Sequence, residues 1–236
     1  MPDDIFLVSY PKSGNTWARF LICNYLTGGK CDFLKVFDMI PDLHMNPELS
    51  LKYVKPRIFK SHLPYQPNYK NVIYLARDGR DVAVSYYFQY IKHKRIDRNT
   101  LFSEFLNEFN SGNLPFGLWS THVTSWLNHK TERFLVIRFE DMLIDPKKEL
   151  EKILQHLGIE IIPQKLDIAV DASSFDKMFK LEHEQHFLVP SLANSNPDIH
   201  FVRKGISGDY LNYFDDSLET QFIEIHFEGM KCLGYI

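Results

Sequence analysis

The chain has 236 residues, of which 44% are hydrophobic and 14% aromatic, and its net charge is -3 at neutral pH. This composition is that of a globular protein and not of a disordered one. The slight negative charge gives no reason to expect a nucleic acid as partner. No segment approaches the roughly 20 apolar residues that span a bilayer, and the N-terminus lacks the pattern of a signal peptide. We expect one α/β domain over residues 1–236, in the cytoplasm.

The three cysteines are Cys23, Cys31 and Cys232. Their spacing matches neither a disulfide framework nor a set of metal ligands, and Cys23 falls on the apolar face of a predicted helix. We therefore expect reduced thiols with a structural role, which suits a cytoplasmic protein.

The first predicted element is an apolar strand over Ile5–Ser9, and a helix is predicted to follow over residues 18–26. Between them lies the segment Tyr10–Trp17. A tight turn between a strand and a helix directs backbone N–H groups and the helix dipole at an anion. The donors of this turn would be Lys12, Ser13, Gly14, Asn15 and Thr16, with Gly14 allowing a positive φ or a close approach. The lysine comes earlier than in the nucleotide P-loop. An ordinary strand-to-helix turn without a ligand is the alternative interpretation of this segment.

Further strands are predicted over Arg57–Ser61, Asn71–Ala76 and Phe134–Arg138. Helical patterns occupy Asp78–Ile91, Leu101–Glu108, Phe116–Lys130, Pro146–Leu157 and Ser217–Cys232. Strands that alternate with helices indicate a central parallel sheet flanked by helices on both faces. Ligands bind at the carboxyl ends of the strands of such sheets. The segment Lys180–Phe201 is rich in polar residues and is predicted to be a long loop.

Lys60 and His62 lie at the end of the second predicted strand. They are two residues apart, so at the end of an extended strand they point to the same side. Histidine is the usual general base near neutral pH, and a neighbouring ammonium group favours its neutral form. The pattern predicts a base at the carboxyl edge of the sheet.

Two further segments carry cations at positions suited to an anion. Arg77 ends a strand and Ser85 lies two helical turns later, so a guanidinium fork and a hydroxyl group can reach one phosphate. Near the C-terminus, Arg203, Lys204 and Gly205 form a second candidate contact. Between Arg77 and Ser85 lie three further charged residues. We interpret them as a solvated charge cluster or as acids at a helix start: Asp78, Arg80 and Asp81.

These four segments together resemble the sulfotransferases that use 3′-phosphoadenosine 5′-phosphosulfate (PAPS), in particular the cytosolic type. Tyr10–Trp17 resembles the family's Y-P-K-S-G-[TN]-T-W loop, and residues 60–64 resemble its K-T-H-L-P. Residues 77–87 resemble its 3′-phosphate segment, and residues 203–210 its R-K-G-x-x-G-D-W, with Tyr210 in place of tryptophan. Phe139–Met142 and residues 173–175 also occur in the family's order.

The resemblance implies a role for each site residue. Lys12–Trp17 would hold the phosphosulfate, with Trp17 stacked on the adenine, and Ser173 and Phe175 would contact the adenine side. The residues holding the 3′-phosphate would be Arg77, Ser85, Arg203, Lys204 and Gly205. His62 would be the catalytic base, and Lys60 and Lys12 would stabilise the transferred and leaving oxygens. The product would be the desulfated nucleotide PAP, and no metal would be required.

Some features depart from the family pattern or leave alternatives open. Phe139 replaces a tyrosine that contacts the nucleotide, and the usual dimerisation pattern is not evident after Tyr210. The acceptor is expected to be a small molecule with a hydroxyl group, or less favourably an amine, and an apolar or aromatic body. Phe88, Tyr90, Phe116 and Trp119 are candidates for its pocket or for the core. A noncatalytic PAPS- or PAP-binding module and a P-loop kinase are the alternative functions.

The segment His183-Glu184-Gln185-His186 resembles a zinc signature, H-E-x-x-H. That signature needs its histidines four residues apart on a helix, and these are three apart in a predicted loop. We expect no metal there.

Overall fold

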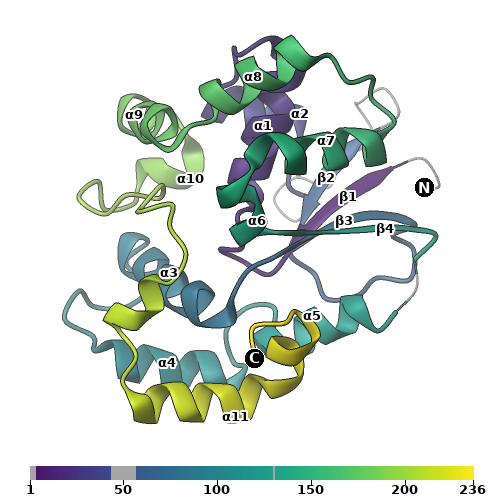
Figure 1. The fold of residues 1–236 in the computed structure, drawn as a ribbon. Coiled ribbons are helices and arrows are strands. Elements are labelled where there is room, and N and C mark those ends of the chain that lie inside the picture. Colours follow the sequence, from purple (N-terminus) through teal and green to yellow (C-terminus); the bar gives the residue numbers. More distant parts are fainter. Residues whose placement is uncertain (1–3, 44–56, 130) are drawn as a thin grey trace.

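The computed structural model describes residues 4–43, 57–129 and 131–236. Its centre is a sheet of parallel strands in the order β2-β1-β3-β4. The strands are β1 (Ile5–Ser9), β2 (Ile58–Ser61), β3 (Asn71–Ala76) and β4 (Arg133–Arg138). Figure 1 shows the helices on both faces of this sheet. The predicted fold class is confirmed.

The helices connect the strands and then continue beyond β4. Helices α1 (Asn15–Thr27) and α2 (Phe33–Met39) follow β1, and α3 (Gly79–Lys92), α4 (Phe102–Ser111) and α5 (Trp119–Leu127) lie between β3 and β4. After β4 come α6 (Phe139–Ile144), α7 (Pro146–Leu157), α8 (Pro163–Ala172), α9 (Phe175–Gln185), α10 (Pro190–Ala193), the short 3₁₀ helix η2 (Asp209–Asn212) and α11 (Asp216–Cys232). No helix in the described part of the chain is long and apolar enough to cross a membrane.

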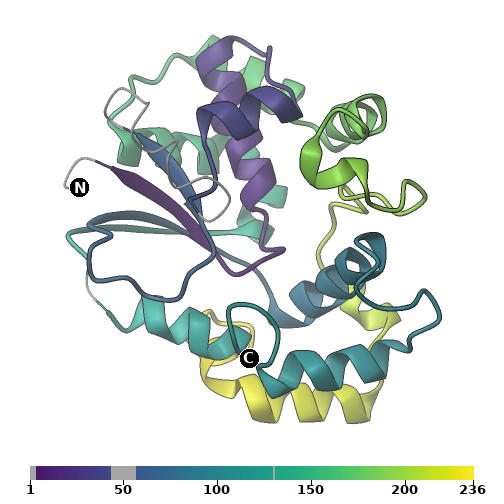
Figure 2. The same cartoon turned by 180° about the vertical axis from the view of Figure 1, so that it is seen from behind.

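Alternate residues of each central strand face opposite layers, as the pleat of a strand requires. Ile5 and Leu7 pack with α1, α7 and α8, whereas Phe6 and Val8 pack with α3, α4, α5 and α11. Figure 2 shows the two layers from behind. Because both faces are covered, β1 and β3 are buried along their whole length, which explains their continuous apolar runs.

The predicted strands agree with the structure within one residue at their ends, but one predicted loop is wrong in part. The segment Lys180–Phe201 begins inside α9, which runs to Gln185, and also contains α10. On α9, His183 and Glu184 are exposed, whereas Met178 and Glu182, four residues apart, are buried. The helix predicted over Phe116–Lys130 is shorter, since α5 covers Trp119–Leu127; Lys130 lies outside the described residues.

The prediction of reduced cysteines is also wrong for two of the three. Cys23 and Cys31 form a disulfide in the structure, and their Cα atoms are 5.7 Å apart. Helix α1 ends at Gly28, which is left-handed, and Asn24 Oδ1 accepts a hydrogen bond from the backbone N–H of Cys31. The chain thus reverses direction within eight residues, a return that cysteine spacing alone does not reveal. Cys232 is free and exposed.

Candidate active site

A cavity of about 230 Å³ lies at the carboxyl ends of β1, β2 and β3. Its walls come from the loop after β1, the part of α3 that carries Ser85 and Gln89, the N-terminal part of α9 and the segment Phe201–Ile206. The predicted site residues that line it are Lys12, Gly14, Asn15, Thr16, Trp17, Lys60, His62, Arg77, Ser85, Ser173, Phe175, Arg203, Lys204 and Gly205. Ser13 is buried and is not among the lining residues.

The loop after β1 has an unusual backbone. Gly14 has φ +91° at the N-cap of α1, and Lys12 is left-handed as well, with φ +71°. A non-glycine residue in this region is strained, and such strain collects at functional sites. A Cβ on Gly14 would lie 2.8 Å from Cδ2 of Phe139. The side-chain amide of Asn15 points back to the sheet and donates to Leu7 O and Ser9 Oγ, so it braces the loop.

Lys12 is a partly buried cation within this loop, and it lines the cavity. Burial is the main cause that lowers its pKa to about 7, and the nearby Arg77 lowers the pKa further. Glu182 partly offsets these effects. The ammonium group lies 4.2 Å from the centre of the Phe201 ring. A lysine in this state gains its charge cheaply only when an anion enters the cavity.

Arg77 connects the two ends of the site. Its Nη1 donates to Lys12 O at 3.2 Å, and its Nη2 donates to Ile206 O at 2.9 Å. The guanidinium carbon also lies 4.2 Å from the centre of the Phe139 ring. Its Nε is buried without a hydrogen-bond partner among the described residues. An unsatisfied buried donor is costly, so this nitrogen fits an anionic ligand.

Arg203 and Lys204 share a carboxylate that the sequence did not single out. Asp209 accepts from Arg203 at 2.5 Å and from Lys204 at 2.6 Å. Burial raises the pKa of Asp209, but the hydrogen bonds from these two cations outweigh it and hold the pKa below its ordinary value. The second predicted phosphate contact is therefore a loop whose cations already have a partner.

The predicted adenine side is held by hydrogen bonds around Ser173. Trp17 Nε1 donates to Ser173 O at 3.0 Å, and Asn24 Nδ2 donates to Ser173 Oγ at 2.9 Å. The Phe139 ring stands edge-on to Trp17 at 5.8 Å. Phe175 packs on the other loop, where a Cβ on Gly205 would lie 2.7 Å from its Cδ2. Asn24 is a residue that sequence reasoning missed, because it lies on what reads as an apolar helix.

His62 is fixed in one tautomer by its neighbours. Its Nδ1 lies 2.7 Å from Ser9 O and 3.3 Å from Ser9 Oγ. A carbonyl oxygen only accepts, so Nδ1 carries the proton and Nε2 is the nitrogen that can take one up. The ring of Phe116 stands edge-on to His62 at 5.5 Å.

A second histidine, His122, supports the first. Its Nε2 donates to the His62 backbone O at 3.1 Å, and its Nδ1 accepts from the Tyr74 hydroxyl group at 3.1 Å. Burial lowers the pKa of His122 to about 4, so it stays neutral. Nothing in the sequence around His122 marked it, since its partners are 48 and 60 residues away.

Lys60 also has a partner that the sequence did not suggest. Its Nζ lies 2.5 Å from Asp42 Oδ2, and the segment around Asp42 bonds to β2 through Lys60 N to Pro41 O and Leu43 N to Lys60 O. Burial lowers the pKa of Lys60, against the opposing effect of Asp42. Lys60 and His62 thus line the same cavity as predicted, with the ammonium group facing a carboxylate.

Two groups of residues have structural roles. Asp78, Arg80 and Asp81 are not a solvated cluster, because all three are buried: Asp78 caps α3, and Asp81 accepts from Gly208 N and Tyr210 N. Asp78 and Asp81 lie at the start of α3, which agrees with the alternative prediction of acids at a helix start. Tyr90 and Trp119 belong to the core.

No group of three or more His, Cys, Asp or Glu residues is arranged to hold a metal ion in the described ranges. His183 lies in the last turn of α9, and His186 follows as its C-cap, so the segment is helical and not a loop. The two histidines remain three residues apart.

The fold and the cavity together define a class of protein. A parallel α/β sheet carries a strained, lysine-bearing loop at one helix N-terminus, a second cationic loop beside it and a histidine with a proton-accepting nitrogen. Such a site suits an enzyme that binds an anionic nucleotide and transfers a group to an acceptor.

Comparison with known proteins identifies the family. The sulfotransferase domain model matches residues 2–234. Sulfotransferase 1E1 from Bos taurus is 34% identical over 246 residues, which cover 96% of this chain and 83% of that protein. The 3-beta-hydroxysteroid sulfotransferase from Cavia porcellus is 31% identical over 246 residues, which cover 99% and 85%. The chain belongs to the sulfotransferase family, and the predicted resemblance is confirmed.

A solved structure agrees with this result. Mouse sulfotransferase SULT7A1 complexed with PAP superposes with a TM-score of 0.77 and 28% sequence identity. The match covers 100% of this chain and 88% of that chain.

Proposed function

We propose that this sulfotransferase transfers the sulfuryl group of PAPS to the hydroxyl group of a small-molecule acceptor, with His62 as general base. The observation that carries the proposal is the pairing of His62 Nδ1 with Ser9 O, which leaves Nε2 to accept a proton. PAPS supplies the sulfuryl group, and PAP is the product. An amine acceptor is the less favoured form of the same reaction.

The residues of the cavity fit a nucleotide with two anionic groups. Lys12, the N-terminus of α1 and the N–H groups after Gly14 would hold the 5′-phosphosulfate. Arg77, with its unsatisfied Nε, would hold the 3′-phosphate together with Ser85 and the segment Arg203–Gly205. Mouse SULT7A1, which has the same fold, is described in complex with PAP.

Each remaining residue would have a step in the reaction. His62 takes the proton of the acceptor hydroxyl group as its oxygen attacks, while His122 and Ser9 keep the imidazole in place. Lys12 stabilises the charge that grows on the leaving phosphate oxygen. Lys60 stabilises the oxygens in transfer, which requires its ammonium group to exchange Asp42 for the sulfuryl group.

We propose that the acceptor has an apolar or aromatic body. Phe116 stands beside His62, and Phe201 and Val202 line the same cavity. A relative carries a steroid in its name, the 3-beta-hydroxysteroid sulfotransferase of Cavia porcellus. The cytoplasmic setting stays a prediction, and the disulfide removes one of the grounds on which it rested.

The test is transfer from labelled PAPS to a panel of phenols, alcohols and amines. We expect His62→Ala to lose at least about 100-fold in kcat, since general bases contribute roughly 100- to 10,000-fold, while its affinity for PAP stays unchanged. His129→Ala is the matched control, because His129 lies outside the cavity and bonds to Ser125 O.

The transfer assay and a comparison of thermal stabilisation by ATP and PAP separate the two alternative functions. PAP binding without transfer to any acceptor, with wild type and His62→Ala alike, would identify a noncatalytic binding module. Stronger thermal stabilisation by ATP than by PAP would instead favour a kinase.

A further inference from the structure

A buried ion pair joins the end of α3 to α9 beside the nucleotide cavity. Lys92 Nζ lies 3.2 Å from Glu182 Oε1, and each side chain is 1% exposed. Removing two charges from water is costly, and the loss of one partner leaves the other uncompensated. An ion pair that is this completely buried needs further hydrogen bonds to be stable. The partners in these hydrogen bonds show which segment the pair fixes in place.

The further hydrogen bonds all go to the segment 196–202. Lys92 Nζ donates to Ile199 O at 2.5 Å and to Asn196 O at 3.4 Å. The carboxylate of Glu182 accepts from Phe201 N at 2.6 Å and from Val202 N at 2.7 Å, with one oxygen for each. The pair therefore fixes this stretch of backbone from both sides.

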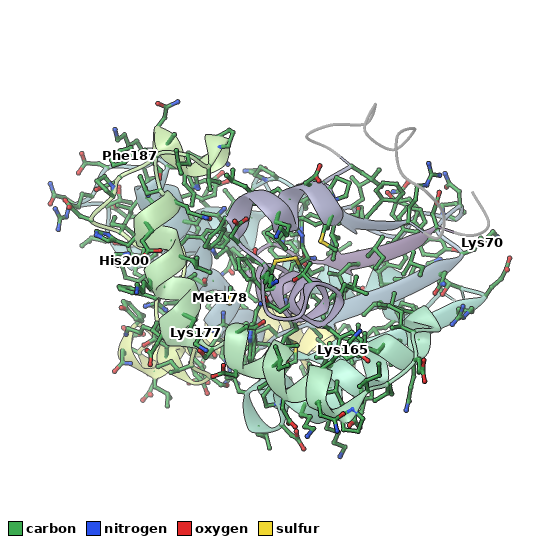
Figure 3. The ribbon with its side chains drawn as sticks, turned by 90° about the horizontal axis from the view of Figure 1, so that it is seen from above. Lys70, Lys165, Lys177, Met178, Phe187 and His200 are labelled. Carbon is green, nitrogen blue, oxygen red and sulfur yellow. A yellow bond between two sulfur atoms is a disulfide. The ribbon has the colours of Figure 1, made fainter. Side chains whose placement is uncertain are left out.

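The two residues extend the helix faces that line the cavity. Glu182 follows the lining residues Phe175 and Met178 by seven and four positions, so the three share one side of α9. Lys92 follows Ser85 by seven positions on α3. Figure 3 labels Met178 on α9 and His200 on the segment 196–202. The ring of His200 lies 4.3 Å from the ring of Phe179 on α9.

The segment 196–202, which the ion pair fixes, continues directly into the nucleotide site. Phe201 lies against Lys12, and Arg203 and Lys204 follow immediately. At its other end the same loop is held by Asp81, through Gly208 N and Tyr210 N. We propose that Glu182 and Lys92 are positioning residues that hold the loop Phe201–Gly205 in the shape that binds the 3′-phosphate end of the nucleotide. This inference rests on the proposed function.

The charges around Lys12 agree with this assignment. Lys12 faces the cations Arg77, Arg203 and Lys92, which lower its pKa, and the carboxylate of Glu182, which raises it. Because Lys92 and Glu182 act in opposite directions, the pair holds the loop and adds little net charge to the cavity. A single charged residue at either position would change the field at Lys12.

The first experiment compares Glu182→Gln with a matched control, Glu184→Gln. Glu184 is on the same helix, but its side chain is 53% exposed and its ion pair with Lys180 spans 3.8 Å. For Glu182→Gln we expect at least a tenfold rise in the Kd of PAP and in the KM for PAPS. Hydrogen exchange of the peptide 196–204 should accelerate about tenfold without ligand. The control should match wild type in every measurement.

A double variant separates positioning from folding. Glu182→Gln leaves Lys92 buried without its partner and lowers the melting temperature. Adding Lys92→Met removes the second charge, and the melting temperature should return toward wild type, since a neutral buried pair is often as stable as an ionic one. We expect the Kd of PAP to stay at least about fivefold above wild type, because the Phe201 and Val202 amides still lack their carboxylate.

Two results would overturn the inference. One is a Glu182→Gln variant whose Kd for PAP and exchange at 196–204 stay within twofold of wild type. The other is a double variant that recovers PAP affinity together with its melting temperature. If wild type itself does not bind PAP, the proposed function fails, and the exchange measurement without ligand still decides whether Glu182 holds the segment.

Discussion

The two loops predicted to bind phosphate are built in opposite ways. In the first, Lys12 is partly buried and strained in a left-handed conformation. In the second, Arg203 and Lys204 both bond to Asp209. The cation of the first loop lacks a carboxylate of its own at ion-pair distance among the described residues, whereas the second must share its cations between Asp209 and the ligand. Cations of the same charge should therefore contribute very different amounts to nucleotide binding and catalysis.

Of the two loops, the first should show the larger effect when its lysine is replaced, as in Lys12→Ala. Loss of a preorganised donor at the site where charge develops costs about 100- to 1000-fold in kcat. Steady-state transfer from PAPS measures it, with the melting temperature as a check that the variant folds.

At the second loop, Lys204→Ala should have a much smaller effect. The Lys204 side chain is 42% exposed and paired with Asp209, and exposed ion pairs are worth about 0.2–1 kcal/mol. We expect less than a fivefold rise in the KM for PAPS. A variant of Lys204 that loses as much as that of Lys12 would remove the contrast between the loops.

The glycines of the two loops sharpen the comparison at the level of packing. Gly14→Ala meets Phe139, which is 6% exposed, whereas Gly205→Ala meets Phe175, which is 38% exposed and can move aside. Both positions have positive φ. We expect Gly14→Ala to cost about 1–3 kcal/mol in the free energy of unfolding and Gly205→Ala less, as measured by urea denaturation.

Gly28→Ala controls for strain alone, because Gly28 has φ +65° with nothing near its missing Cβ. If Gly14→Ala is no more destabilising than Gly28→Ala, the contact with Phe139 does not constrain the first loop.

The charge of Lys12 predicts how nucleotide binding depends on pH. Burial lowers its pKa to about 7, and a bound anion raises the pKa, so binding takes up a proton above pH 7. The Kd of PAP should therefore rise by up to about tenfold per pH unit between pH 7 and 9. Calorimetric titrations at several pH values measure this, and Lys12→Met should abolish the dependence. A Kd that stays constant from pH 7 to 9 would contradict the lowered pKa.

Much of the site was predictable because each predicted phosphate contact is a short continuous segment. A loop such as Lys12–Thr16 sits directly after its strand, and the parallel sheet brings the strand ends together. Asp209 and His122 were not predictable as site residues. The role of Asp209 depends on the Arg203 side chain that faces it, and the role of His122 depends on the backbone carbonyl group of His62. Tertiary packing brings these groups together.

By itself the sequence determined the fold class, the strands and many of the residues that line the cavity, since local apolar patterns and motif order are properties of the chain. Only the tertiary structure decided the electrostatic state of those residues. The surroundings of Lys12 lower its pKa, Lys60 forms an ion pair with Asp42, and Cys23 forms a disulfide with Cys31. The reason is physical: a charge or a thiol takes its properties from the groups within a few ångströms of it, and folding selects those groups.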